Sequence, residues 1–239
     1  MAFTRVQTAT NNGGSGTALA GTFGAAVGSG NTVCGIFSWD DGSGATLSSI
    51  ADDKGNNYTV KTNLAPDTNG QKTLSFFLGN ITNAPTVITV TLSVASSFRT
   101  IIIDEFSGAL AAADPSDGGT GQNQAAPTTT TDLTTSTNIT PTTNGCLIYG
   151  GSVNSGGTQI PTNGTGFTSS NTATVQNGAR TEYLTQATAA AISATFTAAV
   201  NLPHQTVVIA IKPTAGATIT QAFFQRWWDG NFNTELVSY

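Results

Sequence analysis

Apolar and polar residues alternate in short runs from one end of this chain to the other, as in TVITVTL. A period of two places every second side chain on the same face of a β-strand, whereas a helix requires a period of roughly 3.6. Clusters of Gly, Asn, Asp and Pro separate the runs at roughly 8 to 12 residues, a spacing typical of β-sandwiches and barrels. We therefore predict an all-β fold in the form of an antiparallel β-sandwich.

Two of the runs, RTIIIDEF and HQTVVIAIKP, are almost continuously apolar. Strands with so little polar content are usually covered on both faces, so we expect these two to be central strands. The predicted strands, in chain order, are Phe3–Thr8, Thr32–Trp39, Thr46–Ile50, Tyr58–Thr62, Thr73–Ile81, Thr86–Ser93, Arg99–Phe106, Leu133–Ile139, Gly145–Ser152, Thr172–Gln176, Thr181–Thr185, Ala191–Phe196 and Gln205–Lys212.

A polar stretch at 111–131, AAADPSDGGTGQNQAAPTTTT, interrupts the pattern. It could divide two domains, but each half would then keep few strands, and closing one sandwich across a long loop costs little extra entropy. Greek-key and jelly-roll topologies require such crossover loops. We therefore predict a single jelly-roll-like domain over 1–213, with a crossover loop at about 111–131, followed by a short aromatic C-terminal tail over 214–239.

The tail gathers aromatic residues, two of the three tryptophans among them. Phe224, Trp227 and Trp228 share one helical face, and the Asp-Gly pair that follows supplies a stop, so one helical turn or a hook is expected. These side chains either cover the chain's own sandwich or dock onto a neighbouring subunit, because buried Trp anchors dominate interface energetics. The candidate docking residues are Phe223, Phe224, Trp227, Trp228, Phe232 and Tyr239.

Charge and hydropathy exclude several classes of function. The net charge is −5, charged residues make up 9% of the chain, and the basic residues are scattered singly. A nucleic-acid groove needs a basic stripe, so no nucleic-acid partner is expected. No apolar run approaches the roughly 18 to 20 residues that span a bilayer, so no membrane insertion is expected. The start, MAFTRVQTATNNGG, lacks the apolar core of a secretory signal, which predicts synthesis and folding in the cytoplasm.

The two cysteines, Cys34 and Cys146, lie inside apolar segments. We expect buried free thiols that act as small hydrophobic side chains. A disulfide between adjacent strands or across chains is the alternative, and only distances can decide it.

A search for catalytic and ligand-binding motifs yields no constellation. His204 is the only histidine, and the chain has no G-x-S-x-G elbow and no P-loop, so His204 is expected to be an ordinary loop residue. No metal cluster of the usual ligand types can form around one histidine. We predict no cofactor, no metal and no enzymatic activity.

Carboxylates occur in adjacent pairs, at Asp40-Asp41, Asp52-Asp53 and Asp104-Glu105. Neighbours on a strand point to opposite faces, so adjacency does not make a catalytic dyad. The segment Asp52–Asn56 is interpreted as a hairpin turn in which Gly55 takes a positive φ. Calcium bound by these hard oxygen ligands is the alternative, although the spacing is not that of an EF-hand.

Several segments together resemble a known module. They are GNTVCGIFSWDDGSGATLSSIADDKGNNYTV, SFFLGNI, TVITVTL, IIIDEFSGAL and VVIAIKP. The likeness is to a jelly-roll-like β-sandwich of tailed-bacteriophage virion proteins that also occurs in some bacterial surface proteins, with a D-x-x-G-N-x-Y-T hairpin and an E-[FY]-S-G strand. It covers residues 1 to 213. The resemblance implies a structural virion component, such as a capsid-decorating, collar or fibre protein, and it supplies no catalytic residues.

The leading functional hypothesis is thus a virion structural protein that is made in the host cytoplasm. It self-associates into a homo-oligomer, for which a trimer is one candidate, and docks onto other virion proteins through its tail. The alternative is a carbohydrate-binding module for a host-surface glycan, for which Trp39 and Tyr58 are the candidate aromatic platform. Their alternation is more typical of core and hairpin packing. A glycan-cleaving enzyme, the third class, lacks any recognisable set of catalytic residues.

Overall fold

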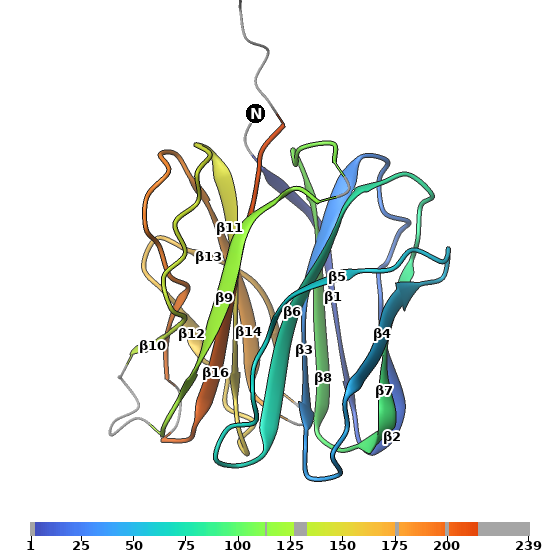
Figure 1. Ribbon diagram of the computed structural model, residues 1–239, viewed down its shortest axis with the longest axis vertical. Helices are drawn as coiled ribbons and strands as arrows, with labels where there is room; N and C mark the ends of the chain where they lie inside the picture. Colours follow the sequence, from blue (N-terminus) through green and yellow to red (C-terminus); the bar gives the residue numbers. More distant parts are fainter. Residues whose placement is uncertain (1–2, 113, 127–132, 175–176, 199–200, 215–239) are drawn as a thin grey trace, which may run out of the picture.

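The computed structural model describes residues 3–112, 114–126, 133–174, 177–198 and 201–214 (Figure 1). Sixteen strands are described, and they divide among four antiparallel sheets. The described residues include no helix, and hence none long and apolar enough to cross a membrane. The predicted all-β fold of packed antiparallel sheets is confirmed.

The first half of the chain forms a five-stranded and a three-stranded sheet. The five-stranded sheet has the order β1 (Thr4–Gly13), β8 (Arg99–Ser107), β3 (Asn31–Asp40), β6 (Gln71–Ile81), β5 (Thr59–Asn63). The three-stranded sheet has the order β2 (Gly16–Thr22), β7 (Val87–Ser96), β4 (Leu47–Asp52). We call β1 to β8 unit 1.

The second half forms the same pair of sheets. The five-stranded sheet has the order β13 (Thr168–Ala173), β14 (Ala179–Gln186), β11 (Cys146–Asn154), β16 (His204–Ile211), β9 (Ser116–Gln124). The three-stranded sheet has the order β10 (Leu133–Thr135), β15 (Thr195–Thr197), β12 (Thr162–Asn163). We call β9 to β16 unit 2.

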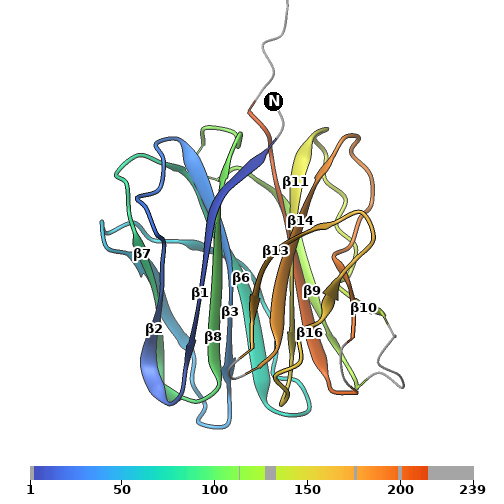
Figure 2. The same ribbon diagram turned by 180° about the vertical axis from the view of Figure 1, so that it is seen from behind.

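The strands of the two units follow one plan. Counted from one within each unit, both five-stranded sheets have the order 1-8-3-6-5 and both three-stranded sheets the order 2-7-4. The two five-stranded sheets face each other, with β3 against β11, β1 against β13 and β5 against β9 (Figures 1 and 2). Because β3 and β11 are the third strand of each unit, and first strands meet fifth strands, an approximate two-fold axis runs parallel to the strands between the units.

Three cores separate the resulting four layers, and this packing of antiparallel sheets agrees with the predicted β-sandwich. Outer core 1, between the sheets of unit 1, contains Phe37, Trp39, Tyr58 and Phe76. The central core, between the five-stranded sheets, contains Cys34, Ile36, Phe77, Ile102, Phe106, Leu147, Tyr149, Val207 and Ile209. Outer core 2, between the sheets of unit 2, contains Cys146, Ile148, Phe167, Ala194, Phe196, Val208 and Ala210. The jelly-roll assignment and the domain boundary at 213 stay predictions.

Both units begin and end at the same pole of the molecule. Thr4 of β1 pairs with Ser107 of β8, and Ser116 of β9 pairs with Ile211 of β16. Just beyond these strands, Ala109 bridges to Pro213. We call this the chain-end pole, uppermost in Figure 1, and the opposite end the loop pole.

The predicted crossover loop at about 111–131 is corrected in part, because its residues Ser116–Gln124 form β9. This strand, SDGGTGQNQ, contains no large apolar residue, so its sequence does not show the alternation of a strand. Its glycines face crowded neighbours: a Cβ on Gly119 would lie 2.3 Å from Cγ of Lys61, and one on Gly121 would lie 3.1 Å from Cδ2 of Leu64. Side chains of β5 and its following loop therefore occupy the space that β9 leaves empty.

The two nearly continuous apolar runs became β8 and β16, and both lie inside five-stranded sheets, as predicted. Strands β2 and β12 were not predicted. Their sequences, GTALAGT and TN, are too Gly-rich or too short to show a period.

Candidate functional site

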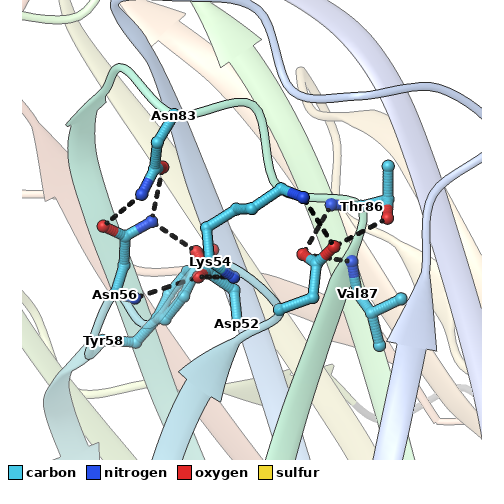
Figure 3. Close-up of polar contacts among 8 residues, drawn as sticks. Asp52, Lys54, Asn56, Tyr58, Asn83, Thr86 and Val87 are labelled. Carbon is cyan, nitrogen blue, oxygen red and sulfur yellow. Dashed lines mark hydrogen bonds and ion pairs between the residues drawn. The ribbon is translucent and has the colours of Figure 1, made fainter.

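The paired acids of the turn between β4 and β5 form the polar cluster in Figure 3. Oδ1 of Asp52 accepts hydrogen bonds from the backbone N–H groups of Lys54 and Asn56, both at 3.0 Å. Its Oδ2 accepts from Nδ2 of Asn56 at 2.7 Å and from the hydroxyl of Tyr58 at 3.3 Å. Gly55 has φ +82°, which completes the turn as predicted. Asp52 is thus a turn-forming residue whose two oxygens are both occupied.

The neighbouring Asp53 points the other way and connects the turn to the start of β7. Its Oδ1 accepts from the N–H of Thr86 at 2.9 Å and of Val87 at 3.2 Å. The Thr86 N–H bond is the main reason that the pKa of Asp53 lies below its ordinary value. Since N–H donors surround both acids, the oxygens do not converge on a cation site. No group of three or more His, Cys, Asp or Glu side chains suited to a metal occurs among the described residues.

Asp104 and Glu105 lie on opposite faces of β8, as predicted for strand neighbours. Asp104 is fully buried in the central core, where its Oδ2 accepts from the hydroxyls of Tyr149 at 2.8 Å and Thr181 at 3.1 Å. The Ser170 hydroxyl donates to its Oδ1. These three donors belong to unit 2, so Asp104 links the two units. Burial raises the pKa of Asp104, although the hydroxyl donors act against that rise.

Glu182 and His204 are buried titratable groups of unit 2. Burial raises the pKa of Glu182 to about 7, while its two oxygens accept from the N–H groups of Gly164 at 2.8 Å and Thr195 at 3.1 Å. His204 was expected in a loop, but it begins β16 and is fully buried. Neither ring nitrogen has a well-formed hydrogen bond to another described residue. Burial lowers the pKa of the imidazole, although the backbone of Leu202 and the charge of Asp67 act against that fall.

The two cysteines are buried free thiols, as predicted. Cys34 lies in the central core and Cys146 in outer core 2, so a sheet separates them. Burial raises the pKa of Cys146 to about 12 and that of Cys34 further still. Both thiols are therefore protonated near neutral pH and unreactive.

The aromatic residues considered as a sugar platform are core residues. Trp39 is 0% exposed and Tyr58 is 7% exposed. The Trp39 ring stacks on Phe37, and its Nε1 donates to the carbonyl of Ala45 at 3.1 Å. The platform proposed at these two positions is wrong, because neither ring can reach a ligand.

A pocket of about 180 Å³ opens at the loop pole, on the seam between the units. Unit 1 provides the end of β3, the loop before β6 and the turn before β8, and unit 2 provides the end of β11 and the loop before β14. We call it the seam pocket. Its lining residues are Asp40, Asn69, Gln71, Phe98, Ser155, Gly156 and Asn177.

Buried amides form the inner wall of the seam pocket. Asn177, which is 1% exposed, donates from Nδ2 to Oε1 of Gln71 at 2.8 Å and to the carbonyl of Phe98 at 3.2 Å. Gly156 donates its N–H to Oδ1 of Asn177 at 3.2 Å, and Asn69 donates to the carbonyl of Ser155 at 3.1 Å. Hydrogen bonds across the seam therefore hold the pocket in one shape.

Sequence reasoning missed this pocket. Its residues come from five separate loops or strand ends, and no local pattern connects them. The one available signal was Phe98, an aromatic residue in the SSFR turn between two predicted strands, where small polar residues are usual. The predicted docking residues Phe223, Phe224, Trp227, Trp228, Phe232 and Tyr239 lie outside the described residues.

Comparisons with protein-family models, with curated proteins and with solved structures found no match. The resemblance to the bacteriophage module therefore stays a prediction.

Proposed function

We propose that this chain is a non-enzymatic structural component of a bacteriophage virion. In this role it decorates the capsid or belongs to the neck, collar or a fibre, self-associates, and docks onto other virion proteins through residues 214–239. It is made in the host cytoplasm and acts in the virion.

The observation that carries the proposal is the position from which the tail departs. Thr214, the first residue of the tail and the last residue that the structure describes, donates its N–H to the carbonyl of Gly108 at 2.7 Å. Its hydroxyl contacts the carbonyls of Gly108 and Ala109, each at 3.0 Å. The aromatic tail therefore starts from a fixed point at the chain-end pole, which suits an anchor that leaves the loop pole free.

The architecture and the chemistry of the acids agree with a structural role. Each unit has eight strands in two facing sheets, the number found in jelly rolls of capsid proteins. Hydrogen bonds within the fold occupy Asp52, Asp53 and Asp104, and Asp104 is inaccessible to solvent. A body held together in this way serves as a rigid module.

Light scattering on the purified protein tests the proposal. We expect the full chain to be an oligomer, and both a chain shortened to end at Pro213 and the full chain with Trp227→Ser and Trp228→Ser to be folded monomers. The matched control is Phe98→Gly, which removes an exposed aromatic ring from the body and should keep the oligomer. Compact monomers in all four samples, with unchanged thermal melting, would contradict the docking role of the tail.

A further inference from the structure

The seam pocket presents an aromatic ring to solvent at some cost to the backbone. Phe98 is 48% exposed and has φ +52°, in the left-handed region that bulky residues seldom adopt. A residue held in such a conformation persists only where surrounding structure imposes it, and such residues concentrate at functional sites. Here the Phe98 carbonyl accepts from buried Asn177, which fixes the turn.

Beside the ring, the pocket offers hydrogen-bond acceptors that the fold leaves unused. Asp40 accepts one bond on Oδ1, from the N–H of Gly42 at 2.9 Å, and its Oδ2 has no partner among the described residues. Asn69 uses Nδ2 to bond Ser155, and its Oδ1 likewise has no partner in the described part of the chain. A ligand that fits these groups must bring hydroxyl or amine donors, because a carboxylate only accepts.

The charge and the size of the pocket narrow the choice of ligand further. The chain carries a net charge of −5, and Asp40 is the one charged residue lining the pocket, so anionic ligands are disfavoured. A lone carboxylate is too few ligands for calcium, which takes six or more oxygens. The volume of about 180 Å³ lies below the roughly 300 Å³ at which drug-sized pockets begin, and a single small ring fits such a space.

We propose that the seam pocket binds one ring of an uncharged saccharide. The hydroxyl groups donate to Asp40 and Asn69, and the C–H face of the ring lies on Phe98. A sugar combines an apolar face with a rim of hydroxyls, which matches an exposed aromatic ring beside unused acceptors. The proposal does not depend on the virion role, because a saccharide can bind whether or not the tail anchors the chain.

The position of the pocket suits an extended glycan. It lies at the loop pole, opposite the point where Thr214 leads into the tail. Both units line it, so the saccharide site exists only where the two units are joined. A chain anchored at one pole would thus present its sugar site at the other.

The test is saccharide binding by the full chain, measured by NMR chemical-shift changes or by calorimetry. The probes are glucose, galactose, mannose and N-acetylglucosamine, with the disaccharides that they form. Phe98→Gly removes the ring and relieves the positive φ, so it should weaken binding by roughly tenfold or more while the protein stays at least as stable. Asp40→Asn removes the charge and keeps the turn acceptor, and it should also weaken binding severalfold.

The matched control is Val94→Thr, a change at another exposed apolar residue, 44% exposed on β7, that should bind like the wild type. Loss in Phe98→Gly and Asp40→Asn with retention in Val94→Thr supports the site. Absence of binding to every probe, or binding that both pocket variants keep, overturns it. The oligomeric state of Phe98→Gly separates the two proposals, because the docking role of the tail predicts no change in it.

Discussion

Units 1 and 2 share one strand order but fill it differently. The outer sheet of unit 1 has strands of 7, 10 and 6 residues, whereas that of unit 2 has strands of 3, 3 and 2 residues. Towards the loop pole, the outward face of β3 carries Phe37 and Trp39, and the outward face of β11 carries Ser152 and Asn154. The same topology therefore tolerates a large aromatic core in one copy and a small, partly polar core in the other.

This difference shows which of the three cores the shared topology requires to be apolar. Both units keep apolar side chains in the central core, because the two five-stranded sheets bury each other. Each outer sheet packs against the rest of the molecule with one face only. Shortening an outer sheet therefore removes less buried area than shortening a five-stranded sheet would. We infer that outer core 1 carries more of the stability than outer core 2, and each prediction below tests that inference or refines it.

The largest expected effect is the truncation of one buried isoleucine in each of the two outer cores. Ile101 on β8 and Ile148 on β11 are both 0% exposed and face outer core 1 and outer core 2. We expect Ile101→Ala to lower the free energy of unfolding by about 4 to 5 kcal/mol and Ile148→Ala by about 2 to 3 kcal/mol. The smaller loss follows because short strands can move to fill the cavity. Chemical denaturation measures both values. Equal losses would contradict the inference that outer core 1 carries more of the stability than outer core 2.

A medium effect is expected where the units join. Asp104→Ala leaves the hydroxyls of Tyr149, Thr181 and Ser170 without their shared acceptor, which should cost about 3 kcal/mol. Tyr149→Phe, the matched control, removes one donor and leaves Asp104 the hydroxyls of Thr181 and Ser170, so it should cost about 1 kcal/mol. Denaturation monitored in both units should remain one transition in the control.

If Asp104→Ala costs no more than Tyr149→Phe, the hydroxyl network does not hold the units together. The central apolar core alone would then account for their association.

The sequence predicted those strands whose own residues form a continuous or alternating apolar pattern. The apolar runs TVCGIFSW and RTIIIDEF were sufficient to predict β3 and β8, and the DDKGNN turn predicted the positive φ of Gly55. Strand β9 was not predicted, because the apolar contacts over its glycines come from Lys61 and Leu64, which are far away in the sequence. The repetition of one strand order in the two units was also not predicted. Corresponding strands share which faces are buried, but they do not share a residue sequence that would reveal a repeat.

The seam pocket could not be predicted, because it depends on how the units are placed. Gln71 and Asn177 are 106 positions apart, and only the two-fold packing of the units brings them within hydrogen-bonding distance. Neither residue type carries a signal of its own, since amides in loops usually serve turns. Phe98 was visible in the sequence as an unusual turn residue, but its exposure follows from the structure alone.

The smallest expected effect is a pH dependence that belongs to unit 2. Glu182 has a pKa of about 7 against an ordinary 4.5, so between these values the folded state binds more protons than the unfolded state. Its contribution to stability is present below pH 4.5 and is lost as the pH rises towards 7. His204 acts in the opposite sense, because its pKa lies below the ordinary 6.5. Its contribution is present above pH 6.5 and is lost as the pH falls.

The two variants Glu182→Gln and His204→Gln separate these opposed contributions. Stability measured from pH 4.5 to 7 should rise more steeply with pH in Glu182→Gln than in the wild type, and less steeply in His204→Gln. Each change in slope is at most about 1.4 kcal/mol per pH unit, the value for one proton. Other titrating groups are common to all three proteins and cancel in the differences. Asp53 of unit 1 has a lowered pKa and titrates below this window. Slopes that shift in the same direction in both variants would show that Glu182 and His204 do not set the pH response.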